Sequence, residues 1–215
     1  MLTLTTLRSV PPFAIGHVRD LRVRWALEEA GLPYQVRLVD SDDQASAEYR
    51  REQPFGQVPV LQDGDTTLFE SGAILLHLGE RQSALLPTDP AARSQAVAWV
   101  FAALNSVEQH VGGLAQLMAF HSDEAWARER RPALEAMALK RLGELDTVLT
   151  DRPYLAGTFS VADIVMTCTL RMLDGHETVE RFPALAAYKA RCIARPAFNK
   201  ALADHAAVYQ AEAAA

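Results

Sequence analysis

Residues 55–71 constrain the fold more than any other stretch of the chain, because they combine two short strands, a proline and a helix start. Apolar runs at residues 58–61 and 66–69 flank an Asp63-Gly64 pair. Such a pair tolerates positive φ and is typical of a tight turn between antiparallel strands. The sequence therefore predicts a β-hairpin that is followed at once by a helix, with Ser71 as its cap.

Pro59 lies within the first of these strands, where it cannot donate a hydrogen bond to a sheet ladder. It marks a sheet edge or a bend. A cis Val58-Pro59 bond would leave the backbone N–H and C=O of Val58 able to pair with an extended peptide. The N–H groups of the helix start at Ser71 favour a nearby carboxylate. The combination predicts a cradle for a short peptide; a kinked edge strand beside a simple serine cap is the alternative.

These residues resemble the glutathione site of the cytosolic glutathione transferases, where a Gln/Lys-Val-Pro strand is followed by a Glu/Gln-Ser pair. The resemblance implies that Gln57 faces the glycine carboxylate and that Val58 pairs with the cysteine through its backbone, next to the bend at Pro59. It also implies that Glu70 and Ser71 hold the γ-glutamyl group.

The first 80 residues alternate between strand and helix patterns. Residues 2–7 and 34–39 read as strands on either side of a helix at 18–30, and such a βαβ unit has parallel strands. A short helix within 41–53, the hairpin and the helix from Ser71 complete the order β-α-β-α-β-β-α. By resemblance this is a thioredoxin-like domain, which we place at residues 1–81.

After a predicted linker at residues 82–90, the strand signal vanishes, and we expect an all-helical bundle over 91–215. One helix is expected to end at Gly112-Gly113, and another to begin behind Pro132. Ser160 and Asp163 have the spacing of a capping box, so a buried cap is preferred over a catalytic role for Asp163. The predicted fold class is thus α/β plus all-α.

The residue that activates the thiol is where this sequence departs from the family pattern. Family members place a Tyr, Ser or Cys after the first strand to lower the pKa of a thiol that is ordinarily near 8.5. Here no tyrosine precedes Tyr34, and both cysteines lie in the second half of the chain. Ser9 is the predicted donor, with Arg19 and His17 near the helix start as alternatives.

Two further arginines follow in the same helix. Arg24 stands four residues after Asp20, which is the spacing of an ion pair on a helix surface. We therefore expect Arg22 and Arg24 to lie on a solvated or dimer-facing surface.

The resemblance implies that glutathione, as a cosubstrate, attacks a small hydrophobic electrophile held between the domains. The candidate wall residues come from one loop and two helices: Phe13, Trp99, Asn105, Glu108, Met118 and Phe120. Ordinary core packing is the alternative for the aromatic members, and a dimer contact is the alternative for Asn105 and Glu108. A non-catalytic glutathione-binding module and a glutathione-dependent peroxidase are the alternative functions.

Composition excludes some partners. The net charge of −6 argues against nucleic acid and anionic membranes, which require a concentrated positive surface. Neither a secretory signal nor a membrane span is recognised, so the expected location is the cytoplasm. The His and Cys spacings predict no metal site. By resemblance, the protein is expected to be a homodimer with a role in detoxification.

Overall fold

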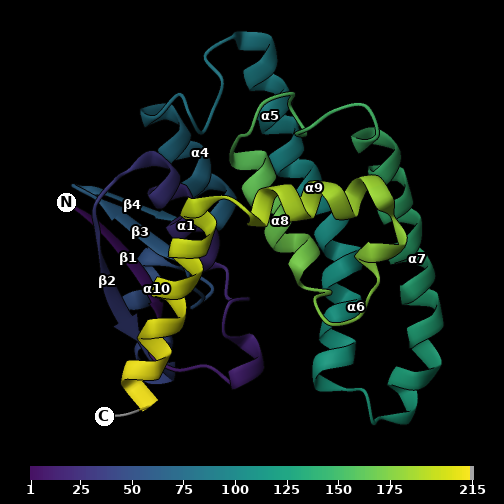
Figure 1. Cartoon of the computed structure of the whole chain (residues 1–215). Coiled ribbons are helices and arrows are strands. Elements are labelled where there is room, and N and C mark those ends of the chain that lie inside the picture. The colour runs from purple at the N-terminus through teal and green to yellow at the C-terminus, as the bar shows by residue number, and fades with distance from the viewer. Residues whose placement is uncertain (214–215) are drawn as a thin grey trace. The chain divides into compact units, whose positions relative to one another are not determined.

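A computed structural model describes residues 1–213, with side chains up to Gln210 (Figure 1). It divides the chain into two units, one formed by Met1–Leu86 with the segment from Arg195 onward, and the other by Pro87–Ala194. The predicted domains, 1–81 and 91–215 around a linker at 82–90, differ from this division mainly in the last helix, which packs in the first unit. Residues 214–215 lie outside the described part of the predicted second domain.

The first unit is built on a four-stranded mixed sheet with the order β2-β1-β3-β4. Its strands are β1 (Leu2–Leu7), β2 (Tyr34–Val39), β3 (Val60–Asp63) and β4 (Thr66–Phe69). β1 and β2 are parallel, whereas β3 is antiparallel to both β1 and β4. The predicted strands and hairpin are confirmed, but the prediction that Pro59 lies within the first hairpin strand is wrong, because β3 begins at Val60. Gly64 supplies the positive φ of 59° at the turn, and β3 begins directly after Pro59.

The three long helices of this unit are α1 (Asp20–Ala30), α4 (Ser71–Arg81) and α10 (Pro196–Ala213). The short elements are η1 (Pro12–Ala14), α2 (Ser41–Ala45) and α3 (Tyr49–Glu52). α1 ends at Gly31, which adopts a left-handed conformation with φ 62°. α1 packs against both α4 and α10, and Figure 1 shows α10 in yellow alongside it. Trp25 is fully buried and meets the edge of Phe198 at 4.8 Å between ring centroids.

The second unit, residues 87–194, consists of helices and the loops between them, and the structure describes all of it. It contains α5 (Pro90–Phe101), the π-helical segment η2 (Ala102–Val107), α6 (Glu108–Phe120), α7 (Ala125–Leu149), α8 (Val161–Arg171), η3 (Val179–Arg181) and α9 (Pro183–Ile193). α8 contacts α5, η2, α6 and α9, and ten of its eleven residues are buried. Its apolar side chains, among them Val165 and Met166, form the centre of this unit.

Two helix boundaries expected from glycine and proline are wrong. α6 continues through Gly112-Gly113 to Phe120, and a Cβ at Gly112 would lie 3.4 Å from Cε of Met172. Gly112 therefore permits close packing within the helix instead of ending it. α7 begins at Ala125, seven residues before Pro132, and Ala127 in its first turn is fully buried. Tertiary packing of this turn outweighs the hydrogen bond that a proline removes.

The capping box at the start of α8 is confirmed. Asp163 is fully buried and accepts hydrogen bonds from the backbone N–H of Ser160 at 2.9 Å and of Leu155 at 3.0 Å. The hydroxyl of Tyr188 donates to the same carboxylate at 2.9 Å. Burial raises the pKa of Asp163, although these donors act in the opposite direction. These hydrogen bonds stabilise the fold, because through them Asp163 joins the loop at Leu155 and the helix α9 to the start of α8.

Candidate functional site

The N-terminal end of β3, an inner strand of the sheet, is preceded by a backbone segment that α2 and α3 hold in place. The side-chain amide of Gln44 donates to the carbonyl of Gly56 at 2.6 Å, and the hydroxyl of Tyr49 donates to the carbonyl of Gln57 at 2.6 Å. Gly56 has φ 65°, and a Cβ there would lie 2.8 Å from the backbone oxygen of Gln44. Only glycine fits this close approach, and the segment is fixed immediately before Val58.

The side chain and the backbone groups of Val58 have different surroundings. Its side chain packs against a buried cluster of Val39, Tyr49 and Val60, and the Val58-Pro59 bond is cis. Among the described residues, no main-chain hydrogen bond reaches the N–H or C=O of Val58. This pair of groups is therefore available for an extended peptide, as the sequence predicts for a cis bond at this position.

Glu70 joins β4 to α4 in a backbone conformation that residues other than glycine rarely adopt, with φ 68° and ψ 113°. Backbone strain of this kind costs about 1–3 kcal/mol and clusters at functional sites. The Glu70 side chain is exposed and makes no capping hydrogen bond to the helix. The strained residue thus presents a carboxylate to solvent beside the N–H groups of the first turn of α4.

Ser71 is not the cap of α4 that the sequence predicts. Glu70 occupies the N-cap position, and Ser71 is the first helical residue. The Ser71 side chain is 3% exposed, and its Oγ accepts a hydrogen bond from Nη1 of Arg22 at 3.1 Å. This bond leaves the hydroxyl proton of Ser71 able to donate to a ligand, with a positive charge behind it.

The prediction that Arg22 and Arg24 lie on a solvated or dimer-facing surface is wrong, since each is 2% exposed within the single chain. Every residue from Asp20 to Leu27 is buried, so this part of α1 has no solvated face. The ion pair between Arg24 Nε and Asp20 Oδ2 is confirmed at 2.8 Å, but both partners are buried. Nε2 of His205 lies 3.3 Å from the other oxygen of Asp20.

His205 connects α10 to the loop before α1. Its Nδ1 accepts a hydrogen bond from the backbone N–H of Gly16 at 3.2 Å. Burial raises the pKa of Asp20, but the adjacent His205 ring and the charge of the Arg24 guanidinium outweigh burial and hold it below its ordinary value. A charged carboxylate in the interior therefore fixes both the start of α1 and the end of the preceding loop.

The three candidates for thiol activation all lie on that loop or at its end. Ser9 is exposed two residues after β1, His17 is exposed next to the anchored Gly16, and Arg19 is exposed at the N-cap of α1. The positive end of the helix dipole is thus closest to Arg19 and His17. The choice among these three residues stays a prediction.

The candidate electrophile-contacting residues belong to both units. Phe13 is 54% exposed in η1 of the first unit, whereas the others lie on α5, η2 and α6 of the second. Phe120 is 61% exposed and Asn105 is exposed, while Trp99 and Met118 are half-buried.

Glu108 differs from Asn105 in its surroundings. It is 8% exposed, with Oε2 lying 3.4 Å from the hydroxyl of Thr169 on α8. Asn105 lies within the π-helical segment and is exposed, whereas Glu108 follows that segment. The i to i+5 bonding of a π-helix changes which residues share a face, so the spacing of three does not place the two side chains in one polar cluster.

A metal site and a membrane-spanning helix are two features that the sequence does not predict. Within residues 1–213, no group of three or more His, Cys, Asp or Glu side chains has the arrangement needed to hold a metal ion. No helix in the same range is long and apolar enough to span a bilayer. Cys192 is buried, and burial raises the pKa of its thiol to about 12, so it is protonated at neutral pH.

Comparisons with known proteins agree with this geometry. The model of the glutathione S-transferase N-terminal domain matches residues 13–80, and that of the C-terminal domain matches residues 109–196. Glutathione S-transferase 4 of Zea mays is 31% identical over 190 residues, which cover 83% of this chain and 85% of that protein. The chain belongs to the glutathione transferase family.

Two other members of this group are informative. A disulfide-bond oxidoreductase of Escherichia coli (strain K12) is 30% identical over 89% of this chain and 91% of its own length. The crystal structure of a glutathione transferase from Burkholderia graminis, with two glutathione molecules bound per subunit, superposes with a TM-score of 0.81. That structure is 30% identical and covers 94% of this chain and 87% of its own. The thioredoxin-like and helical architecture is therefore that of the family.

Sequence reasoning missed Arg22, Tyr49 and His205 as supports of the site. Arg22 contacts Ser71, Tyr49 holds Gln57, and His205 holds Gly16. No local signal marks Arg22 or His205, because their partners lie 49 and 189 positions away in the chain.

Proposed function

We propose that this family member binds glutathione along the backbone of Val58, just before β3, and activates its thiol for attack on a small hydrophobic electrophile. The observation that carries the proposal is the backbone of Val58, whose N–H and C=O have no main-chain partner among the described residues. An extended cysteine residue matches such a donor and acceptor pair.

The neighbouring residues account for the two ends of the tripeptide. Gln57 is exposed beside Val58 and would meet the glycine carboxylate. At the other end, Ser71 and the first N–H groups of α4 would hold the γ-glutamyl carboxylate, with Arg22 behind Ser71. The exposed carboxylate of Glu70 would pair with the γ-glutamyl amine. Pro59 separates Val58 from Val60, the first residue of β3.

Activation of the thiol would come from Ser9, or from His17 or Arg19. A hydroxyl or a cation next to the sulfur, together with the positive end of α1, favours the thiolate. Each unit by which the thiol pKa falls corresponds to about 1.4 kcal/mol. The electrophile would lie against the aromatic and polar candidates named above. A homodimer, a cytoplasmic location and a role in detoxification are parts of this proposal that rest on family resemblance.

Ultraviolet absorbance of bound glutathione tests the proposal. We expect the thiolate to be visible at pH 7, and we expect Ser71→Ala to weaken glutathione binding about tenfold through the loss of one charge-assisted contact. Ser83→Ala, at an exposed serine in the connection after α4, is the matched control and should leave binding unchanged. Ser9→Ala, His17→Asn and Arg19→Met then identify the activating residue as the one whose replacement raises the thiol pKa.

Two outcomes contradict parts of the proposal. Glutathione that binds with an unshifted thiol indicates a binding module, and absence of binding at millimolar glutathione refutes the site itself. Conjugation of a chlorodinitrobenzene is the assay for the transfer reaction.

The oxidoreductase relative favours one second candidate, which is reduction of a disulfide by two glutathione molecules. In that reaction the first thiolate displaces one sulfur to form a mixed disulfide, and the second thiolate releases the other sulfur and leaves glutathione disulfide. The first unit contains no cysteine, so both thiols would come from glutathione. Turnover of hydroxyethyl disulfide without conjugation of the chlorodinitrobenzene would favour this candidate.

A further inference from the structure

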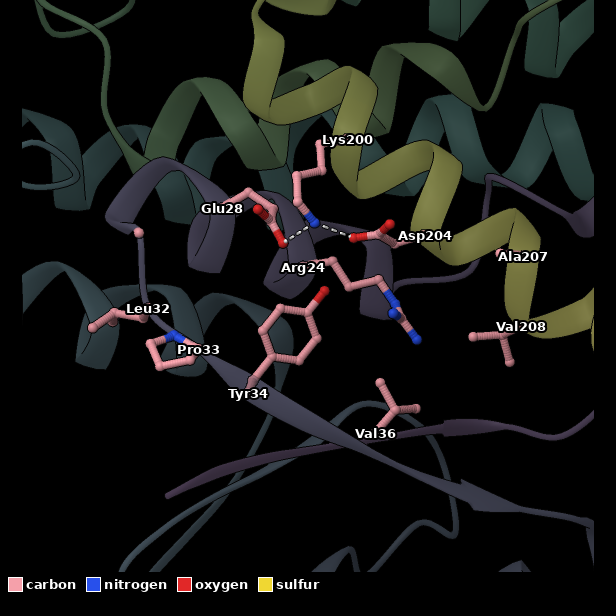
Figure 2. A pocket seen from close by; sticks show the side chains of 11 residues that line it. Arg24, Glu28, Leu32, Pro33, Tyr34, Val36, Lys200, Asp204, Ala207 and Val208 are labelled. Atoms are coloured by element: carbon pink, nitrogen blue, oxygen red, sulfur yellow. Dashed lines mark hydrogen bonds and ion pairs between the residues drawn. The ribbon is translucent and has the colours of Figure 1, made fainter.

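A groove of about 950 Å³ opens on the first unit between the end of α1, the start of β2 and α10. We call it the α1–β2–α10 groove, and Figure 2 shows the side chains that line it. It contains none of the residues that are proposed to hold glutathione. The residues that give it its chemistry are Arg24, Glu28, Tyr34, Val36, Lys200 and Val208.

Arg24 provides hydrogen-bond donors at this groove. Its Nε is occupied by Asp20, and the residue is 2% exposed. Its Nη2 is buried and has no hydrogen-bond partner among the described residues. Figure 2 shows the guanidinium group between the Tyr34 ring, Val36 and Val208. A buried guanidinium nitrogen without a partner favours an incoming oxygen acceptor, because the donor is otherwise unsatisfied.

Tyr34 adds a second donor. The Arg24 guanidinium carbon lies 6.0 Å from the centre of its ring, and Figure 2 shows the hydroxyl pointing toward the Arg24 side chain. Burial raises the pKa of Tyr34, and the carboxylates of Glu28 and Asp204 act in the same direction, although Arg24 opposes them. The phenol is therefore protonated at neutral pH and can donate to an acceptor held by Arg24.

The rest of the groove limits the size and charge of a ligand. Val36 is 38% exposed, and with Val208 it offers an apolar surface next to the two donors. At the rim, the Lys200 ammonium lies 3.2 Å from Glu28 and 2.5 Å from Asp204. Two carboxylates against one ammonium make this rim negative, which disfavours phosphates and other multiply charged anions.

We propose that the α1–β2–α10 groove binds a small monocarboxylate with an apolar body, such as an aryl alkanoate. The carboxylate accepts from Arg24 and from the Tyr34 hydroxyl, and the apolar body packs on Val36 and Val208. This binding site is separate from the proposed glutathione site and does not depend on it.

The test uses phenylbutyrate as the probe and phenylbutyramide as its uncharged analogue, with the full chain labelled for amide NMR. We expect saturable binding of one phenylbutyrate per chain, with the largest shifts at Val36 and Val208. The amide should bind about tenfold more weakly, because it loses the charge-assisted contact. Shifts confined to Val58 and Ser71, equal affinity for the amide, or no binding at millimolar probe would each overturn the proposal.

Variants on β2 provide a matched pair. Val36→Glu places a negative charge inside the groove and should weaken phenylbutyrate binding about tenfold or more. Gln35→Glu places the same charge on the opposite face of the strand, where Gln35 is also exposed, and should leave binding unchanged. Equal effects of the two variants would overturn the proposal.

Tyr34→Phe keeps the ring and removes only the hydroxyl, so it tests the second donor without a charge change. Its affinity for phenylbutyrate should fall about three- to tenfold, as expected for one hydrogen bond. An affinity equal to that of the unmodified chain would rule out the role assigned to this hydroxyl.

Discussion

Replacing Ser71 with alanine distinguishes two roles for one buried hydroxyl. In the structure its Oγ accepts from Nη1 of Arg22 at 3.1 Å, and neither side chain is more than 3% exposed. A hydrogen bond to a charged group contributes about 1.5–3 kcal/mol, and its loss leaves a buried guanidinium donor without that acceptor. We therefore expect Ser71→Ala to lower the free energy of unfolding by about 2 kcal/mol.

The measurement is urea unfolding of four proteins: the unmodified chain, Ser71→Ala, Arg22→Met and the double variant. Once methionine has replaced Arg22, the Ser71→Ala change should cost less than about 0.5 kcal/mol, because the donor is gone. The interaction energy from this cycle should be about 1.5 kcal/mol. Ser83→Ala serves as the control for loss of an exposed hydroxyl and should have no measurable effect.

An equal loss of stability in both backgrounds would refute this reasoning. Such a result would mean that Ser71 stabilises the start of α4 itself, as a helix cap does, regardless of Arg22. The hydrogen bond between Arg22 on α1 and Ser71 on α4 would then contribute nothing measurable to the free energy of unfolding.

Four other substitutions have clear expected outcomes. Asp163→Asn should lower the free energy of unfolding by about 3 kcal/mol in urea titrations, since an amide cannot accept from all the donors on the carboxylate. Because the pKa of Asp20 is lowered, its stabilisation is present above about pH 4 and is lost as the pH falls through the folded-state value. Asp20→Asn should therefore flatten the acid side of a plot of unfolding free energy against pH, and an unchanged slope would contradict the assignment. Gly113→Ala should raise the thermal midpoint, because a Cβ there meets nothing within 4 Å, whereas Gly79→Ala should lower it, because its Cβ would lie 2.8 Å from Leu86.

Most of the first unit could be predicted from its sequence because its signals are local. The strand pattern of β1 and the Asp63-Gly64 turn each act within a few residues, and each appears in the structure where it was expected. The residues proposed for the peptide cradle lie on either side of one hairpin, so the order of the elements brings them near one another.

The errors arise where distant packing outweighs a local preference. Pro132 and Gly112 are helix-breaking residues by propensity, yet Ala127 and Met172 make the contacts that keep their helices continuous. Arg22 and Arg24 carry charges that favour water by default, but the acceptors that allow their burial lie on other turns and on α4. Local patterns cannot show which buried charge will find a partner.

The place of α10 has a consequence for how this protein is made. Trp25 and Asp20 in α1 reach their partners Phe198 and His205 only when the segment after Arg195 has left the ribosome. The second unit is thus an insertion inside the first, and it can complete its own packing earlier although it begins later. A nascent chain halted at residue 194 would expose the apolar side of α1, and we expect such truncated chains to be substrates for chaperones and proteases.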